Sequence, residues 1–584
     1  MVGLLSYSNT FKVPFVFDDK VNISRSPVIK TLKYFTDNST FDTTDVSQQV
    51  KDSLKTRILG VLSLAINYKL HGLDVTGYHI FNLAVHIINA GLVYYLIILT
   101  LNSPFLSRIA VEKQDTSKSY ALFGALLFIS HPIATQAVTY IIQRFASLAT
   151  LFYLLSVVMY VKARSCRSLP AQVALYAVFV LSAICAMNTK EIAFTLPFSI
   201  ALYELMFLEG GVKKKISCLI PILLTIPVIP ITLIVGNGSL SDTETINRSL
   251  SIASSPDINR WDYLTTQFRV IVTYIRLLFL PVNQNLDYDY PVYRSIFNLE
   301  ILISLLFISS IIAMAIYLYV LSGRADDKRI FRLTSFGILW FFLCLSVESS
   351  IIPIADVIFE HRLYLPSVGF SLFLVSVYIV AEDKFRHGWI ATTAVTLIVL
   401  TLAIATYKRN NVWHDEISLW SDVVRKSPNK VRPQYDLGVF YDQSGDFEKA
   451  LIQYQRAIEL NPKDSEAYYN MGNVYQKQGD LDAAIKKYQT ALKLNPDYFE
   501  AHNNLGNILF KQGQYQEAME QYQEVIRLKP DYADAHNNLG SVYGILGRDD
   551  EAIEEFQRAL KLNPDDVDAR KNLDLLMNTK MTPR

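Results

Sequence analysis

The sequence has few cysteines and few charged residues, and both scarcities exclude classes of protein. Only four of its 584 residues are cysteines, and they lie in or beside apolar segments at spacings that match no zinc motif. We therefore expect neither a disulfide framework nor a structural zinc site. Charged residues make up 19% of the chain and hydrophobic residues 51%, which is more apolar than an ordinary soluble protein.

Net charge is also nearly absent, but the value of +1 combines two opposite parts. From Asn410 onward the chain carries 21 Lys and Arg against 28 Asp and Glu, and before Asn410 it carries 34 against 26. A basic, apolar front and an acidic, polar back indicate two domains with different surroundings. The acidic back argues against nucleic acid as a partner. The first residues lack an apolar core followed by small residues, so we expect no cleavable signal peptide.

Apolar runs recur through the front of the chain. A helix needs roughly 20 apolar residues to span a bilayer. We expect ten spans within a polytopic membrane domain over residues 76–407, at 76–100, 119–131, 145–162, 171–187, 191–208, 216–235, 297–321, 333–347, 363–381 and 388–407. An outer loop over 1–75 would precede this domain, and a connecting helix over 408–428 would follow it.

Basic residues in short loops indicate the cytoplasmic side of each span. The loops that carry Lys213–Lys215, or Arg329 and Arg332, should therefore be cytoplasmic. This orientation places four loops outside, at 1–75, 132–144, 236–296 and 348–362. Ten spans would also return the chain to the outer side after Tyr407.

The apolar segment 262–281 carries Arg269 and Arg276 on one helical face. We interpret it as an amphipathic or re-entrant helix on the outer surface. The alternative is a true span with two snorkelling arginines, which would invert every later loop.

Four polar residues in the first span, His79, Asn82, His86 and Asn89, lie on one stripe of a helix. Polar side chains in lipid must face protein or water. The stripe either forms interhelical hydrogen bonds or takes part in chemistry, with His79 and His86 as supporting residues.

The back of the chain repeats every 34 residues. Prolines recur at this step from Pro428 to Pro564, and glycines recur from Gly438 to Gly540. Each unit, such as "AHNNLGNILFKQGQYQEAMEQYQEVIRLKP", reads as two helices joined by a turn. The pattern resembles the tetratricopeptide repeat, a helical hairpin that stacks into a superhelix. Four repeats and a capping helix would cover 429–578.

One register of the first repeat helices holds amide side chains, at Asn470, Asn504 and Asn538. A ladder of amides inside a superhelix can bond an extended peptide backbone without demanding a particular sequence. We therefore expect the ladder to bind a peptide, and the alternative is that it serves only packing and helix caps.

Several stretches resemble those of one family. They are "FVFDDKVNI", "LSLAINYKLHGLDVTGYHIFNLAVHIINA", "HPIATQAVTYIIQR", "KEIAFTLPFSIALYE", "NLDYDYPVY" and "FEHRLYLPSVGF", followed by the repeats. Together they resemble the transmembrane and tetratricopeptide-repeat protein O-mannosyltransferases. The resemblance implies an all-α fold, in which a GT-C-type membrane domain precedes an extracytoplasmic solenoid. It also implies a sugar donor linked to polyprenyl phosphate, such as a mannosyl donor. Because the loop charges place the repeats and the acidic loop on the same side, we expect the repeats to hold a protein acceptor.

The resemblance marks Asp18 and Asp19 as the catalytic signature. Sugar transfer needs a carboxylate that takes the proton of the acceptor hydroxyl, and one base in a single displacement would invert the anomeric centre. We expect Asp18 to be this base, while Asp19 positions the acceptor or holds a divalent cation. No histidine or third acid completes a metal-binding set in the sequence.

Cations must also stabilise the leaving phosphate. Our candidates are His361 and Arg362, followed by Arg144, Lys190 and Arg269. Glu360 would orient Arg362, and Glu191 would pair with its neighbour Lys190. For each arginine the alternative is a structural ion pair or a contact with a lipid headgroup.

Two features depart from the family pattern. The family places a span before the acidic loop, whereas this chain begins inside that loop, and Gln136 stands where the family often has an acid. Two other functions stay open: a membrane scaffold whose repeats recruit partners for envelope assembly, and a transporter whose path the polar stripe lines.

The similarity to bacterial relatives favours a bacterial inner membrane with the repeats in the periplasm. Four Asn-X-Ser/Thr sites in the outer loops would instead suit an endoplasmic-reticulum membrane with lumenal repeats, at Asn22, Asn38, Asn237 and Asn247.

Overall fold

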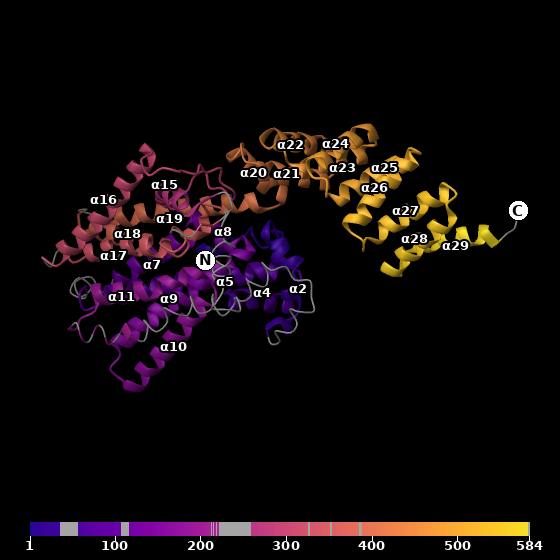
Figure 1. Cartoon of the computed structure of the whole chain (residues 1–584). Helices are drawn as coiled ribbons and strands as arrows, with labels where there is room; N and C mark the ends of the chain where they lie inside the picture. Colours follow the sequence, from indigo (N-terminus) through magenta and orange to yellow (C-terminus); the bar gives the residue numbers. More distant parts are fainter. Residues whose placement is uncertain are drawn as a thin grey trace. The chain divides into compact units, whose positions relative to one another are not determined.

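The chain folds into two compact helical units, Met1–Leu419 and Trp420–Arg584 (Figure 1). The computed structural model describes every residue except 36–55, 107–115, 212, 214, 216, 218, 221–257, 325–327, 351–352, 355, 385–387 and 582–584. Every element in the described residues is a helix, which confirms the all-α class. The expected span at 216–235 lies almost entirely outside the described residues, as do Asn38, Asn237 and Asn247.

The helices of the first unit differ in length. The shorter helices are α1 (Val2–Ser6), α2 (Pro27–Lys30), α8 (Thr135–Val138) and α11 (Leu196–Phe207). The longer ones are α4 (Ile58–His71), α5 (Val75–Leu101), α7 (Ser117–Ser130), α9 (Arg144–Ser165), α10 (Leu169–Met187), α15 (Arg260–Phe279), α16 (Leu299–Ser322), α17 (Phe331–Leu345), α18 (Pro366–Lys384) and α19 (Gly388–Asn410). The single-turn helices η1 (Lys20–Ser24), η2 (Leu32–Phe35), η4 (Pro132–Ala134), η5 (Ile141–Gln143), η6 (Glu191–Thr195), η8 (Glu360–Leu363) and η9 (Asn411–Trp413) connect them.

Six described helices are long and apolar enough to cross a membrane, which makes the chain a membrane protein. They are α5, α9 with η5, α10, α16, α18 and α19. A seventh span is obtained if α7 and the η4–α8 segment, which bend by 49° at His131, count as one broken span. Two other expected spans are shorter helices, because α17 has 15 residues and α11 has 12. The arginine-bearing helix α15 is not among the six.

Helices α17 and α18 cross at unusually close range. A Cβ atom added to Gly337 would lie 2.6 Å from the carbonyl oxygen of Gly369, and one added to Gly369 would lie 2.5 Å from that of Gly337. Small residues at a membrane helix crossing allow the two backbones to meet and gain van der Waals contact. This crossing fixes the segment that leads from η8 into α18.

The N-terminal arm, residues 1–35, packs into the membrane unit. Helix α1 contacts α5, α7 and α19, and the arm buries Tyr7 and Val16 completely. The side chain of Asn410, the last residue of α19, donates a hydrogen bond to the carbonyl of Ser6, the last residue of α1, over 2.9 Å. The arm therefore holds the segment with the acidic pair in a defined place.

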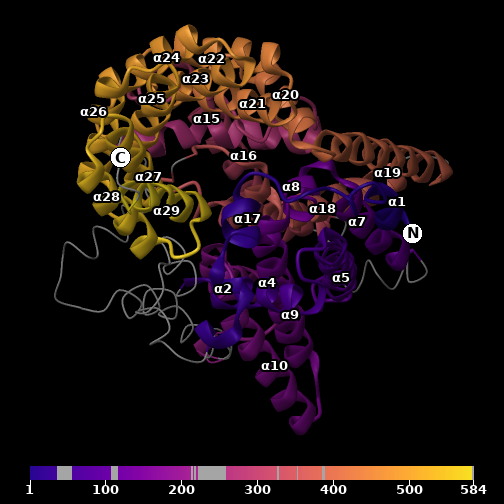
Figure 2. The ribbon, with the colours of Figure 1, turned by 90° about the vertical axis from the view of Figure 1, so that its right-hand side faces the viewer.

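The second unit consists of stacked helical hairpins that follow a curved path (Figure 2). After α20 (Glu416–Lys426), which begins in the first unit, come α21 (Val431–Gln443), α22 (Phe447–Leu460), α23 (Ser465–Gln478), α24 (Leu481–Leu494), α25 (Phe499–Lys511), α26 (Tyr515–Leu528), α27 (Ala533–Ile545), α28 (Asp549–Leu562) and α29 (Val567–Met581).

One contact explains the repeated glycine of these hairpins. In the second hairpin, a Cβ atom on Gly472 would lie 2.5 Å from the Tyr488 ring. Tyr454, Tyr522 and Phe556 pack in the same way on the equivalent glycines of the other hairpins. The glycine leaves space for the ring of the second helix, so the 34-residue step reflects one contact made four times.

We predict that Gly369→Leu prevents stable folding, because the new side chain must enter the backbone of α17. Overpacking of this kind costs about 3 kcal/mol or more. Gly91→Leu is the matched control, since a Cβ atom at Gly91 in α5 meets no atom within 4 Å. The melting temperature of the purified protein should fall strongly for the first variant only, and equal melting temperatures would disprove the close crossing.

Candidate active site

The acidic pair lies in a strained turn of the N-terminal arm. Phe17 adopts a φ of 50°, a left-handed conformation that is uncommon for a bulky residue and often marks functional sites. The next residue, Asp18, donates its backbone N–H to the Tyr140 hydroxyl over 3.1 Å, and its carbonyl accepts from the Asn22 side chain. The turn thereby fixes the backbone from which the Asp18 carboxylate projects.

Asp19 is completely buried and joins the arm to the membrane helices. Its Oδ1 accepts the Ile142 N–H over 2.7 Å, and its Oδ2 accepts the Val16 N–H over 3.2 Å. Burial raises the pKa of Asp19 to about 8, and the nearby Asp18 charge adds to the rise, while the two N–H donors oppose it. Both oxygens of Asp19 thus serve the local fold.

Asp18 lines a polar cavity of about 170 Å³ together with two cations, Arg57 and Lys190. Asn22, Ser26 and Gln143 add further polar groups to the wall. The arm, α4, η5 and the turn before η6 each contribute residues, so the cavity exists only when these segments pack together. A carboxylate facing cations across a small cavity is suited to chemistry that removes a proton beside a developing anion.

Each cation of the cavity has a carboxylate counter-ion. Arg57 donates two hydrogen bonds to Glu191, over 2.9 and 3.1 Å. The Lys190 Nζ atom lies 2.6 Å from Glu348 Oε1, and both side chains are less than 10% exposed. The Glu191 charge raises the pKa of Arg57. Burial acts to raise the pKa of Glu191, but the Arg57 charge and its hydrogen bonds hold it below the usual value.

Arg362 adds a positive charge to this region without a paired carboxylate. Its guanidinium donates to the backbone carbonyls of Asp356 and Val357 over 2.8 and 3.1 Å, and to the Tyr263 hydroxyl over 3.4 Å. No ion pair involves Arg362 among the residues that the structure describes. The two pairs Arg57–Glu191 and Lys190–Glu348 cancel, and the Arg362 charge balances that of the Asp18 carboxylate, so one net positive charge remains only once Asp18 has taken a proton.

His361 is a neutral neighbour of these cations. Burial lowers its pKa well below the usual value, and the charges of Lys190, Arg362 and Arg57 lower it further. Its Nδ1 atom is buried and has no hydrogen-bond partner within the described part of the chain. A neutral imidazole with an unused ring nitrogen can donate a hydrogen bond to an incoming oxygen.

The structure gives three other candidates different contacts, away from the cavity lining. Arg144 donates to Asn67 Oδ1 over 2.6 Å and to two backbone carbonyls of α4 and α5. Arg269 is partly exposed and lies 3.9 Å from Glu300. Glu360 accepts from the Gln284 side chain, the Asn285 N–H and the Tyr288 hydroxyl, and so holds the loop after α15.

The polar stripe of α5 makes hydrogen bonds to other segments. His79 donates to the Val13 carbonyl over 2.9 Å, and Asn82 to that of Val138 over 3.1 Å. His86 donates through Nε2 to the Ile129 carbonyl and accepts the Tyr364 hydroxyl at Nδ1 over 2.6 Å. Asn89 donates to the Ser147 carbonyl. The stripe thus ties the N-terminal arm, α7, α8, α9 and the residue that follows η8 to α5.

The asparagine ladder of the repeats also makes contacts within the protein. Asn470 donates to the Tyr435 hydroxyl over 2.7 Å, and Asn504 donates to Asn473 Oδ1 over 3.0 Å. Asn538 donates to Asn507 Oδ1 over 3.1 Å. Each amide thereby links one hairpin to the preceding one.

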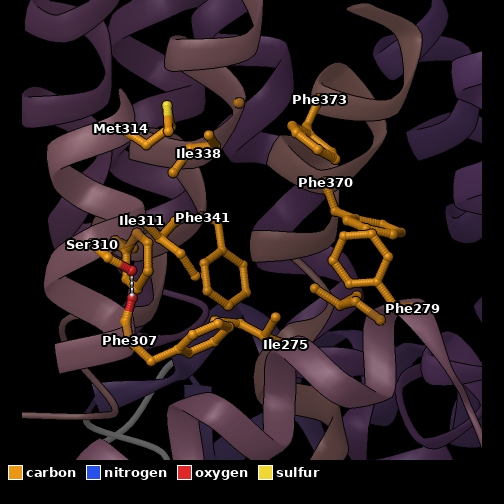
Figure 3. Close-up of a pocket in the computed structure, with 13 residues that line it drawn as sticks. Ile275, Phe279, Phe307, Ser310, Ile311, Met314, Ile338, Phe341, Phe370 and Phe373 are labelled. Carbon is orange, nitrogen blue, oxygen red and sulfur yellow. Dashed lines mark hydrogen bonds between the residues drawn. The ribbon is translucent and has the colours of Figure 1, made fainter. Parts of the chain in front are cut away.

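An apolar groove of about 410 Å³ lies between α15, α16, α17 and α18 (Figure 3). Phenylalanines dominate its lining, at 279, 307, 341, 342, 370 and 373. Ser310 brings a hydroxyl to the groove, but it donates to the Phe307 carbonyl over 2.7 Å. Figure 3 shows the aromatic rings converging on this space, which makes the groove suitable for a hydrocarbon chain.

Comparisons with known proteins agree with this architecture. Family models described as TPR repeat match residues 438–479, 477–513 and 506–547, and the model described as Tetratricopeptide repeat matches 533–566. A protein O-mannosyl-transferase of Caenorhabditis elegans is 26% identical over 467 residues, which cover 79% of this chain and 62% of the relative. Protein O-mannosyl-transferase Tmtc3 of Drosophila melanogaster is 24% identical, with 79% and 54% covered. The mouse relative TMTC3 is 23% identical, with 78% and 50% covered.

The chain is a homologue of the transmembrane and tetratricopeptide-repeat protein O-mannosyltransferases. The resemblance inferred from the motifs is thereby confirmed. The chain spans between half and about three fifths of the length of these relatives. Among solved structures, the crystal structure of MamA is 30% identical over 25% of this chain and 86% of that chain, with a TM-score of 0.25. The crystal structure of YrrB is 20% identical over 33% and 96%, with the same TM-score.

Sequence reasoning missed two residues of the site, Arg57 and Glu348. Arg57 directly precedes an apolar helix and lies two residues after Lys55, and Glu348 follows α17 in the short stretch "SVESS". Glu191 was expected to pair with its neighbour Lys190, but its partner in the structure is Arg57. Only a rule that every buried cation needs a carboxylate could have directed attention to these residues.

We predict that Asp19 carries a proton at neutral pH. Its folded-state pKa is raised, so its contribution to stability is full at low pH and is lost as the pH rises through about 8. Infrared difference spectra should show a protonated carboxyl band that disappears with a midpoint near this value and is missing in Asp19→Asn. The melting temperature should also fall more in the wild type than in Asp19→Asn between about pH 6 and about pH 9. A wild-type spectrum without that band would contradict the prediction.

Proposed function

We propose that the chain is a GT-C-type membrane glycosyltransferase. It moves a sugar, mannose or a similar hexose, from a polyprenyl-phosphate carrier to a hydroxyl group of a protein outside the cytoplasm. One observation carries the proposal: Asp18, the residue expected to be the base, shares a small cavity with the cations Arg57 and Lys190. The names of the relatives, protein O-mannosyl-transferases, support the reaction class.

The reaction begins when the Asp18 carboxylate accepts the proton of the acceptor hydroxyl. The hydroxyl oxygen then bonds to the anomeric carbon while the bond from that carbon to the phosphate oxygen breaks. The polyprenyl phosphate leaves with the bonding electrons, and Asp18 later releases its proton to solvent. A single displacement of this kind inverts the anomeric centre.

Cations stabilise the phosphate as its negative charge grows. Lys190 and Arg57 face the cavity while Glu348 and Glu191 hold them in place. Arg362 adds a third positive charge, and neutral His361 adds an N–H donor. Groups fixed in advance by ion-pair partners need little reorganisation during the reaction, and this is the main source of electrostatic catalysis.

The apolar groove supports a lipid-linked donor. Two tyrosines of helix α15 contact the segment that carries Arg362. The Tyr263 hydroxyl accepts a hydrogen bond from Arg362, and the Tyr274 hydroxyl donates one to the Phe359 carbonyl over 3.0 Å. The next residue, Ile275, already lines the groove. The same helix thus serves a charged head at one place and a hydrocarbon chain at another.

The acceptor would be a protein segment presented by the repeats. Positive charges in the short loops favour an outer position for both the acidic loop and the repeat unit. The compartment is either the periplasm of a bacterial inner membrane or the lumen of the endoplasmic reticulum.

The proposal predicts that Asp18→Asn lowers sugar transfer by about a hundredfold or more, because the general base is lost. The assay follows radiolabelled hexose from polyprenyl phosphate into glycoproteins of membranes that contain the variant. Asp74→Asn is the control, since Asp74 is exposed and caps α5, and asparagine keeps that cap. Full transfer by Asp18→Asn would refute the enzyme and leave the scaffold function, for which the repeats alone suffice.

The orientation predicts that a reporter active only in the cytoplasm stays inactive when it is fused after Arg584. The same reporter placed after Arg329, in a loop expected inside, is the control and should be active. Activity of the C-terminal fusion would rule out acceptor presentation by the repeats on the outer side.

A further inference from the structure

We propose that the segment Asn411–Glu416, which leads from the last span into the repeats, positions the turn of the N-terminal arm that carries Asp18. We call this turn the catalytic turn. Trp413 and Glu416 are the positioning residues, and each acts on the backbone next to Asp18. The inference rests on the proposed role of Asp18 as base. The sequence analysis predicted only a connecting helix for this segment, and the proposal gives it a further role at the active site.

The first contact runs from Trp413 through Tyr140 to Asp18. The Trp413 and Tyr140 rings stack with centroids 5.5 Å apart and an angle of 29° between their planes, and both residues are at most 1% exposed. Tyr140 then accepts the Asp18 N–H. The Trp413 Nε1 atom has no hydrogen-bond partner among the described residues, so this ring acts through packing.

The same stack supports the strained residue before the base. The Phe17 ring lies against Tyr140 with centroids 6.4 Å apart. A bulky residue in the left-handed region is held there only when its surroundings compensate, and a strain of about 1–3 kcal/mol is typical. Removal of the Trp413 ring would free Tyr140 and allow Phe17 to relax, which would turn the Asp18 carboxylate away from the cations.

The second contact is the ion pair between Glu416 and Lys20. The Lys20 Nζ atom lies 2.6 Å from Glu416 Oε1, with the side chains 33% and 16% exposed. Lys20 begins η1, two residues after the base, whereas the Tyr140 contact is made at the base itself. The segment thus holds the catalytic turn at two places along its backbone.

Further hydrogen bonds fix the segment in turn. Asn410 accepts the Thr139 hydroxyl over 2.9 Å, and Asn411 accepts the Asn9 amide over 2.6 Å. Both partners, Thr139 and Asn9, belong to the first unit. Small misplacements of a catalytic group lower rates steeply, by about a hundredfold for an error near 1 Å, so a rigid connection here is of direct use.

Hydrogen exchange of the full chain tests the positioning role without any assay of activity. Backbone amides in residues 15–24 should exchange faster in Trp413→Ala and in Glu416→Gln than in the wild type, since their contacts are lost. Trp413→Phe keeps an aromatic ring and should restore most of the protection. Trp389→Ala is the matched control, because Trp389 is 65% exposed on the same helical segment. Unchanged exchange in both Trp413→Ala and Glu416→Gln would overturn the proposal.

Kinetics separate this inference from the proposed function. Trp413→Ala should lower kcat about tenfold or more with an unchanged KM for the donor, and Glu416→Gln should lower it less. If both variants keep wild-type kcat while Asp18→Asn abolishes transfer, the positioning role is wrong and the enzyme stands. If Asp18→Asn keeps full activity, the proposed function itself fails. Should Trp413→Ala not accumulate in membranes, Glu416→Gln and Trp413→Phe decide the question.

Discussion

Polar groups that are removed from water must find their partners inside the protein, and the first unit is organised around this requirement. Asp19 illustrates it, because two backbone N–H groups from separate segments satisfy its buried carboxyl. The polar stripe of α5 follows the same rule, with His79 bonded to the N-terminal arm and His86 to Tyr364. These bonds connect segments that are far apart in the sequence, so the need to satisfy buried groups also determines the shape of the cavity.

The same requirement explains why the cavity is suited to an anion. Lys190 and Arg57 are each balanced by a carboxylate, while Arg362 contacts only neutral oxygen atoms among its described partners. A buried positive charge without a counter-ion is costly unless a ligand supplies the negative charge. A phosphate group would supply such a charge at the moment of transfer.

Sequence reasoning succeeded where the contacts are local. The 34-residue step predicted the hairpins because Gly472 and Tyr488 belong to one hairpin and every hairpin repeats their contact. Helix lengths were less predictable, since Pro132 breaks one apolar run and η6 shortens another. The amides of the ladder were expected to bind a peptide, and the contacts that the structure shows for Asn504 and Asn538 lie between hairpins.

The site was only partly predictable, because its contacts join residues that are far apart in the sequence. Asp18 and Lys190 followed from chemistry and family resemblance, and both line the cavity. Arg57 has no local pattern that distinguishes it from any other cation before a helix. Arg144 and Arg269 have the residue type that phosphate binding needs, but which arginine meets a carbonyl and which meets a ligand depends on tertiary packing.

The most direct test of the proposed chemistry is an electron cryomicroscopy structure of the full chain with a bound polyprenyl-phosphate hexose. We expect the phosphate to contact Lys190 and Arg57, with the anomeric carbon on the side of Asp18 and the lipid chain in the groove beside Phe370. A phosphate bound away from Lys190, with no sugar facing Asp18, would contradict the proposed active site.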